Sequence, residues 1–93
     1  MTKYMVVARY GERVDWDEVG KLIPAEQARV GELMREGRLE RLYLAQGRKA
    51  VFLVLNASSE AALTEALESL PLYKFWELEV LPLEAPLTLQ STP

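Results

Sequence analysis

The chain has 93 residues, 49% of them apolar, and a formal net charge of −3 at pH 7, which is typical of one small folded domain and excludes a disordered chain. Acids and bases are interspersed, so no basic face is offered to nucleic acid or to an anionic membrane. The chain has no Cys and no His, which excludes thiolate nucleophiles, disulfides, zinc–thiolate sites and the usual haem ligand.

Hydropathy predicts no membrane segment and no targeting segment. The longest apolar run, AVFLVL, has six residues, far fewer than the ~20 that span a bilayer. The opening stretch MTKYMVVARYGE lacks the small-residue cleavage site of a signal peptide. We therefore expect a cytoplasmic protein with no membrane partner.

A strand and a long helix are the first predicted elements. Residues 3–9, KYMVVAR, are rich in β-branched and aromatic residues and end at a polar turn. A helical repeat of apolar residues then runs to the glycine of MREG. Pro24 leaves two possible starts: it lies in the first turn of a helix from about residue 23, or it kinks a longer helix capped by Asp15 or Asp17. We expect the longer helix, because its apolar stripe includes Val19.

Glu26 interrupts the apolar stripe of this helix. At about 100° per residue it lies close to one line with Ile23, Val30 and Leu33. A carboxylate buried there without a partner would have a raised pKa and could carry protons near neutral pH. If it were paired with Arg41 or Arg9, it would stay ionised and act structurally.

The remaining elements complete a small α+β fold. Residues 38–46 and 49–57 are strand-like runs joined by QGR, which suits a hairpin, and the second run is apolar on both faces. A second helix, capped by Ser58 or Ser59, is followed by a strand over residues 74–82. The order β-α-β-β-α-β predicts a ferredoxin-like fold, a four-stranded antiparallel sheet with two helices on one face.

This fold leaves one face of the sheet without a cover. A chain of this size buries only ~60 to 65% of its unfolded surface, so we expect a homodimer in which two sheets pack face to face. The domain should span residues 1–83. Residues 84–93 still carry leucines between two prolines and suggest an extended arm, laid on a neighbouring subunit or on its own domain.

Two stretches of the sequence are similar to those of a known family. They are AEQARVGELMREGRLERLYLAQGR, residues 25–48, and LPLYKFWELEV, residues 70–80. From about Lys3 to Leu83 the chain resembles the muconolactone isomerase-like branch of the dimeric α/β barrel superfamily. The resemblance implies the ferredoxin-like fold, a dimer that assembles into a ring of dimers, and movement of a double bond in a small unsaturated lactone or related acid, without cofactor or metal.

The resemblance also suggests roles for four residues. Glu26 falls at a family position occupied by Glu and is the acid/base candidate. Arg41 and Arg48 stand where isomerases of the family carry His, and either could hold a substrate carboxylate. Tyr43 aligns with an aromatic residue that would line the pocket.

Two other function classes were weighed against the isomerase. One is a non-catalytic module for ligand binding or oligomeric assembly on the same scaffold, because a fold alone does not determine a function. The other is a haem or quinone oxygenase, as in sister branches of the superfamily. The lack of His disfavours the haem enzyme.

Overall fold

The computed structural model describes residues 1–84 and has the predicted β-α-β-β-α-β order. Its elements are β1 (Thr2–Tyr10), α1 (Trp16–Arg35), β2 (Leu39–Leu44), β3 (Ala50–Ala57), α2 (Glu60–Glu68) and β4 (Trp76–Leu83), with short 3₁₀ turns η1 (Gln46–Arg48) and η2 (Tyr73–Phe75). The expected arm lies outside the described residues from position 85 onward, so its docking stays a prediction. No helix of the described part is long and apolar enough to cross a membrane.

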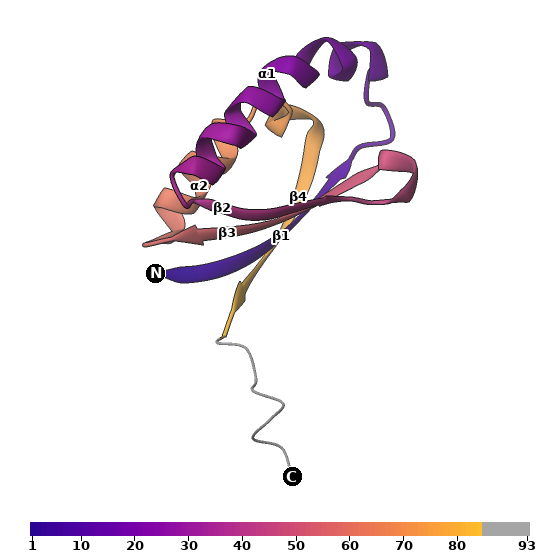
Figure 1. Ribbon diagram of the computed structural model, residues 1–93. Coiled ribbons are helices and arrows are strands. Elements are labelled where there is room, and N and C mark those ends of the chain that lie inside the picture. The colour runs from indigo at the N-terminus through magenta and orange to yellow at the C-terminus, as the bar shows by residue number, and fades with distance from the viewer. Residues whose placement is uncertain (85–93) are drawn as a thin grey trace.

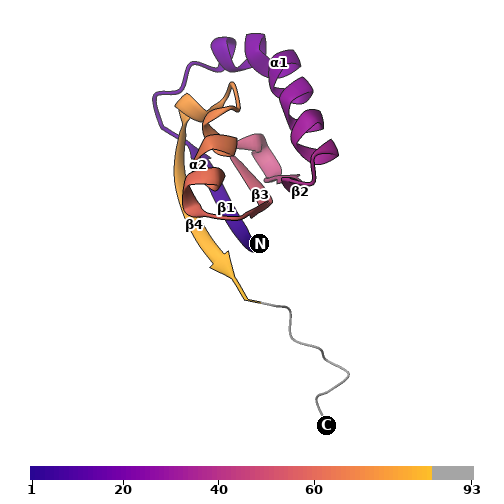
Figure 2. The ribbon, with the colours of Figure 1, turned by 90° about the vertical axis from the view of Figure 1, so that its left-hand side faces the viewer.

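The four strands form one antiparallel sheet in the order β2-β3-β1-β4. β3 is central, as its apolar character on both faces predicts. At the centre of the sheet Val6 of β1 pairs with Leu53 of β3 on one side and Val80 of β4 on the other. Both helices lie on the same face of the sheet (Figures 1 and 2), and the opposite face has no covering element within residues 1–84.

The core fills the space between the helices and the sheet. Side chains alternate across each strand, so every second residue of β1 and β3 points toward the helices. The largest fully buried side chains come from β1, β2 and β3, from α1 and from the segment after α2: Val6, Leu33, Leu39, Leu53, Leu55 and Leu70. The end of the sheet under the last turns of α1 and under α2 is therefore the tightly packed part of the domain.

The first helix starts at the earlier of its two possible positions. Asp15 caps it, because the Asp15 carboxylate accepts hydrogen bonds from the backbone N–H groups of Asp17 (3.0 Å) and Glu18 (3.3 Å). Pro24 therefore lies inside the helix, where it has no N–H to donate to the carbonyl of Gly20. Gly37, with φ of 77°, ends the helix in the left-handed conformation that glycine adopts without steric cost. The prediction of the longer helix is confirmed.

The last strand begins two residues later than predicted. Residues 73–75 form a 3₁₀ turn in which the Phe75 N–H donates to the Leu72 carbonyl at 3.0 Å. Phe75 packs against the core from this turn, so the alternating pattern of the strand starts only at Trp76. The turn places Leu72, which is 3% exposed, directly beneath α1.

Candidate active site

A cavity of about 640 Å³ lies between the first half of α1 and the hairpin end of the sheet. This volume is in the range of small-molecule sites, and the walls are mostly apolar. The lining residues come from the end of β1, from α1, from β2 and β3 with their hairpin, and from the segment after α2: Tyr10, Trp16, Val19, Gly20, Ile23, Glu26, Gln27, Val30, Leu42, Leu44, Gly47, Arg48, Lys49, Val51, Leu72 and Trp76. Trp16 and Leu44 are about half exposed, which puts them at the mouth.

Glu26 is the buried carboxylate of this cavity. Its side chain is only 6% exposed, and one carboxylate oxygen accepts the backbone N–H of Leu72 at 3.0 Å. Burial raises the pKa of Glu26 above the ordinary 4.5, and the Leu72 hydrogen bond offsets part of that rise. Glu26 is therefore a candidate for holding or releasing a proton closer to neutral pH than an exposed glutamate.

Neither arginine considered as a partner for Glu26 pairs with it. Arg9 instead bonds Glu79 at 3.1 Å, and Arg41 lies on the other face of the sheet. Among the ion pairs of residues 1–84, none involves Glu26. The structural alternative, a Glu26 kept ionised by an arginine, is therefore wrong within this chain.

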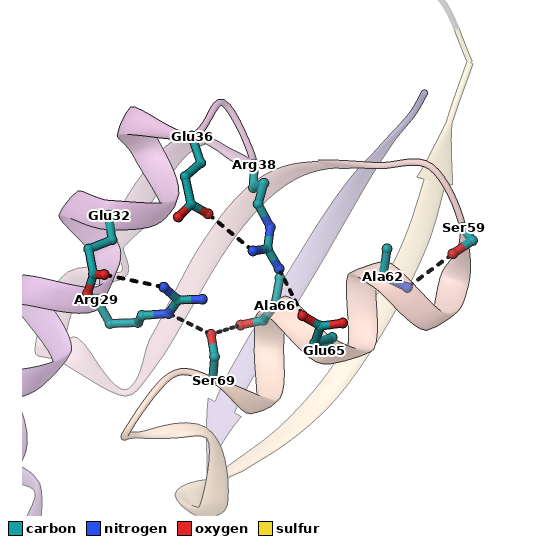
Figure 3. Close-up of polar contacts among 9 residues, drawn as sticks. All are labelled: Arg29, Glu32, Glu36, Arg38, Ser59, Ala62, Glu65, Ala66 and Ser69. Carbon is teal, nitrogen blue, oxygen red and sulfur yellow. Dashed lines mark hydrogen bonds and ion pairs between the residues drawn. The ribbon is translucent and has the colours of Figure 1, made fainter.

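A polar clasp of Arg29, Ser69 and Ala66 joins α1 to the end of α2 (Figure 3). One turn after Glu26, the Arg29 Nε donates to the Ser69 hydroxyl at 2.9 Å, and that hydroxyl donates to the Ala66 carbonyl at 2.6 Å. Ser69 is three residues before Leu72, the hydrogen-bond donor to Glu26. The clasp thus fixes the position of α1 relative to the chain segment on which the carboxylate rests.

Arg48 lies on the cavity wall opposite the helix, in the hairpin between β2 and β3. Gly47 (φ 79°) and Arg48 (φ 59°) both have the left-handed backbone conformation, which costs a non-glycine residue about 1 to 2 kcal/mol. A hydrogen bond from the Arg48 N–H to the Ala45 carbonyl, at 2.9 Å, closes the turn. Within residues 1–84 no carboxylate forms an ion pair with Arg48. Its guanidinium is thus available for a negatively charged group at the rim.

The structure separates the other two predicted binding residues from the cavity. Arg41 pairs across the sheet with Val54, and Tyr43 pairs with Phe52, which places all four on the face away from the helices. Tyr43 is 58% exposed there. Glu26 and Arg48 are therefore brought together at one cavity, whereas Arg41 and Tyr43 lie outside it.

Three aromatic residues of the cavity wall were not among the predicted site residues. The Tyr10 ring lies between Trp16 and Trp76, at centroid distances of 4.8 Å and 6.2 Å. Burial raises the pKa of the Tyr10 phenol, and the nearby Glu26 carboxylate raises it further. A signal was present in the sequence, because Tyr10 ends a strand and Trp16 opens a helix six residues later, but Trp76 joins them only through the pairing of β1 with β4.

The arrangement has the parts for moving protons on a bound organic molecule. It offers a carboxylate with a raised pKa, an apolar space large enough for a small ring, and cations at the rim. Within the described range, no three or more acidic side chains gather as ligands for a metal ion. This combination defines a small ferredoxin-like protein with a cavity suited to acid–base work.

The chain belongs to the muconolactone delta-isomerase family, whose sequence model matches residues 3–86. Among solved structures it is similar to a crystal structure of muconolactone isomerase determined at 3.3 Å resolution. The identity is 26%, the match covers 98% of this chain and 97% of the other, and the TM-score is 0.74. A comparison with proteins of curated function finds no match. The family and the fold predicted from the sequence are confirmed.

Proposed function

We propose that this protein is a cofactor-free isomerase that moves a double bond in a small unsaturated lactone or a related acid. The observation that carries the proposal is the position of Glu26, buried without a cationic partner in residues 1–84 and lining an apolar cavity of about 640 Å³. The family membership and the similarity to muconolactone isomerase support the same chemistry.

In the proposed reaction Glu26 acts first as a base and then as an acid. Its carboxylate takes a proton from the carbon at one end of the system conjugated with the carbonyl, and the electrons of that C–H bond form a dienolate. The protonated Glu26 then returns the proton to the carbon at the other end of that system, so the double bond moves and the enzyme is regenerated. A raised pKa suits both steps, because a carboxyl group with a pKa near the working pH accepts and releases protons with similar ease.

Arg48 is the proposed contact for a substrate carboxylate. It lines the cavity from the side opposite α1, and a guanidinium can bind a carboxylate through two parallel hydrogen bonds. We therefore infer a small acidic molecule as ligand, with its charged end at the hairpin and its apolar ring toward Glu26. No cofactor or metal takes part in this scheme.

Glu26→Gln tests the proposal, because it removes the proton carrier while leaving an oxygen that can accept the Leu72 N–H. Isomerisation of muconolactone in D₂O, followed by NMR, should slow by about 10²-fold to 10⁴-fold. Glu12→Gln, at an exposed glutamate outside the cavity, is the matched control and should keep full activity. Unchanged turnover and deuterium exchange in Glu26→Gln would remove Glu26 from the mechanism.

We also propose that the protein forms a homodimer. A homodimer is expected for the isomerase and equally for the alternative function, a non-catalytic assembly module. The sheet face opposite the helices carries Met5, Val7, Phe52 and Val54 at its centre, together with exposed Leu81 (46%). We assign Arg41 and Tyr43 to this contact rather than to the substrate. A second sheet packed on this face would cover the apolar side chains, and such dimers could assemble further into a ring.

The dimer and the module have their own test. Val54→Glu places a charge at the centre of the uncovered face and should lower the molecular mass seen by sedimentation, whereas Glu12→Gln should not. A pure assembly module predicts no turnover on any lactone and altered assembly in Glu26→Gln.

A cytoplasmic location belongs to the same proposal, because a chain without Cys needs no oxidising compartment.

A further inference from the structure

Tyr10 stands at the end of β1 with its ring held by two indoles. Trp16, the first residue of α1, lies 4.8 Å away between ring centroids, and Trp76, the first residue of β4, meets the ring edge-on at 6.2 Å. All three residues line the cavity that contains Glu26. The phenol is therefore fixed in orientation by aromatic packing from two separate elements.

The indole N–H of Trp76 is a buried donor that lacks an acceptor. Trp76 is 9% exposed, and no atom of the described residues meets hydrogen-bond geometry with its Nε1. The Tyr10 and Trp76 rings are in edge-on contact, and the Trp76 side chain lowers the pKa of Tyr10 in opposition to burial. Buried donors are almost always satisfied, and the phenol oxygen of Tyr10 is an acceptor on the neighbouring ring.

The phenol is also kept in its protonated form. Burial is the main cause of the raised Tyr10 pKa, and the Glu26 carboxylate adds to it. If the phenol oxygen accepts the Trp76 N–H, its own proton stays free to be donated to another oxygen. No hydrogen bond donated by this hydroxyl is formed within residues 1–84, so that proton is left for a ligand.

We propose that Tyr10 is a second catalytic residue, whose hydroxyl donates a hydrogen bond to the carbonyl oxygen of the substrate while Glu26 removes a proton from the conjugated system. The proposal rests on the proton transfer by Glu26 proposed above. As the C–H bond breaks, its electron pair moves toward the carbonyl oxygen, and the Tyr10 O–H stabilises the negative charge that develops there. The phenol keeps its proton throughout, and Trp76 acts as a positioning residue for the Tyr10 oxygen.

Tyr10→Phe tests this role in turnover, because it keeps the ring and removes only the hydroxyl. The kcat for muconolactone should fall by about 10²-fold to 10³-fold with little change in KM. Tyr73→Phe removes the same atom from a tyrosine outside the cavity and should leave kcat unchanged. Trp76→Phe should raise the Tyr10 pKa in a spectroscopic titration, a shift that a purely structural role would not produce.

A binding measurement separates this proposal from the role of Glu26. 4-Nitrophenol, whose phenolate resembles the charged oxygen of a dienolate, is titrated into Glu26→Gln and into Glu26→Gln/Tyr10→Phe, with phenolate absorbance as the readout. We expect the second variant to bind the phenolate at least about tenfold more weakly, as for the loss of a hydrogen bond to a charged group. Equal affinity of the two variants, or no binding to the first, would overturn the role of Tyr10 even if Glu26→Gln abolishes turnover. A weaker second variant would support Tyr10 even if Glu26→Gln stays active.

Discussion

The two halves of α1 lie over the same sheet but serve different purposes. In the second half Leu33 is fully buried, and Arg29 is tied to α2 through Ser69. In the first half Gly20 and Ile23 line a cavity instead of a packed core. Figure 1 shows the reason, because α2 lies beside the last turns of α1, whereas the hairpin between β2 and β3 lies at the opposite end of the sheet, under the first half of α1. One amphipathic stripe thus forms a core where a second helix closes the layer and a cavity wall where none does.

Glu26 lies at the boundary between these halves. It is as buried as a core residue, yet it also lines the cavity, and its hydrogen bond to Leu72 comes from the chain segment that ends the closed region. A carboxylate that carries protons must be both buried from water and open to a cavity. The closed half removes water and raises its pKa, and the open half leaves it facing the cavity.

The largest expected effect distinguishes the two halves by their packing. Leu33→Ala should lower the free energy of unfolding by about 2 to 5 kcal/mol, because it leaves a void in the closed core. Ile23→Ala, in the first half on the cavity wall, should cost only about 1 to 2 kcal/mol, because the atoms removed already border open space. Urea unfolding at one fixed protein concentration measures both values. Similar losses for the two variants would mean that the cavity is closed in solution.

A smaller effect follows from the pKa of Glu26. Because this pKa is higher in the folded chain than in the unfolded chain, the folded state binds more protons between the two values, and stability falls as pH rises through that window. The stabilising effect of the protonated group is fully present below the unfolded pKa and is lost above the folded one. Wild type should therefore lose stability relative to Glu26→Gln as pH rises from about 4.5, by no more than about 1.4 kcal/mol per pH unit.

The measurement is urea unfolding of both proteins across this pH range. A constant difference between wild type and Glu26→Gln would show that the Glu26 carboxyl group titrates normally. In that case the Glu26 side chain would be more exposed to water in solution than its burial indicates. The difference in packing between the two halves of α1 would then be smaller.

Periodicity in the sequence predicted the elements and the fold, because a period of 2 or 3.6 residues reports directly which side of a strand or helix is buried. It also singled out Glu26 as a polar residue on a buried stripe. The sheet face on which Arg41 and Tyr43 lie was harder to predict. A register shift in β2 between Leu39 and Arg41 reverses the alternation of side chains and turns both residues to the face away from the helices. A regular strand would have placed them on the face of Leu39.

The size and the walls of the cavity could not be predicted from the sequence. The size of the cavity depends on where α2 ends relative to α1, and its aromatic wall depends on the pairing of β1 with β4, which brings Trp76 beside Tyr10. Both depend on tertiary contacts, which no local sequence pattern encodes. Arg48 was singled out by the family resemblance, at a position where isomerases carry His, but its placement on the wall of the same cavity as Glu26 emerges only from the assembled fold.

The smallest expected effect concerns the clasp that joins the halves. Ser69→Ala removes the hydroxyl that accepts from Arg29 and should cost about 1 kcal/mol of stability. The loosened segment should also weaken the hydrogen bond from Leu72 to Glu26. Because that bond favours the charged carboxylate, the Glu26 pKa should rise further, which NMR titration of its side-chain carbon can follow.

Ser59→Ala is the matched control for this clasp, since it makes the same substitution at the other end of α2. Ser59 caps that helix by accepting the Ala62 N–H at 3.1 Å, so its loss should also cost about 1 kcal/mol. Ser59 lies at the opposite end of α2 from Ser69 (Figure 3), so its substitution should leave the Glu26 titration unchanged. An equal pKa change in both variants would attribute the effect to general loosening of α2. A change in Ser69→Ala alone would show that the closed half of α1 tunes the acid in the open half through Arg29, Ser69 and Leu72.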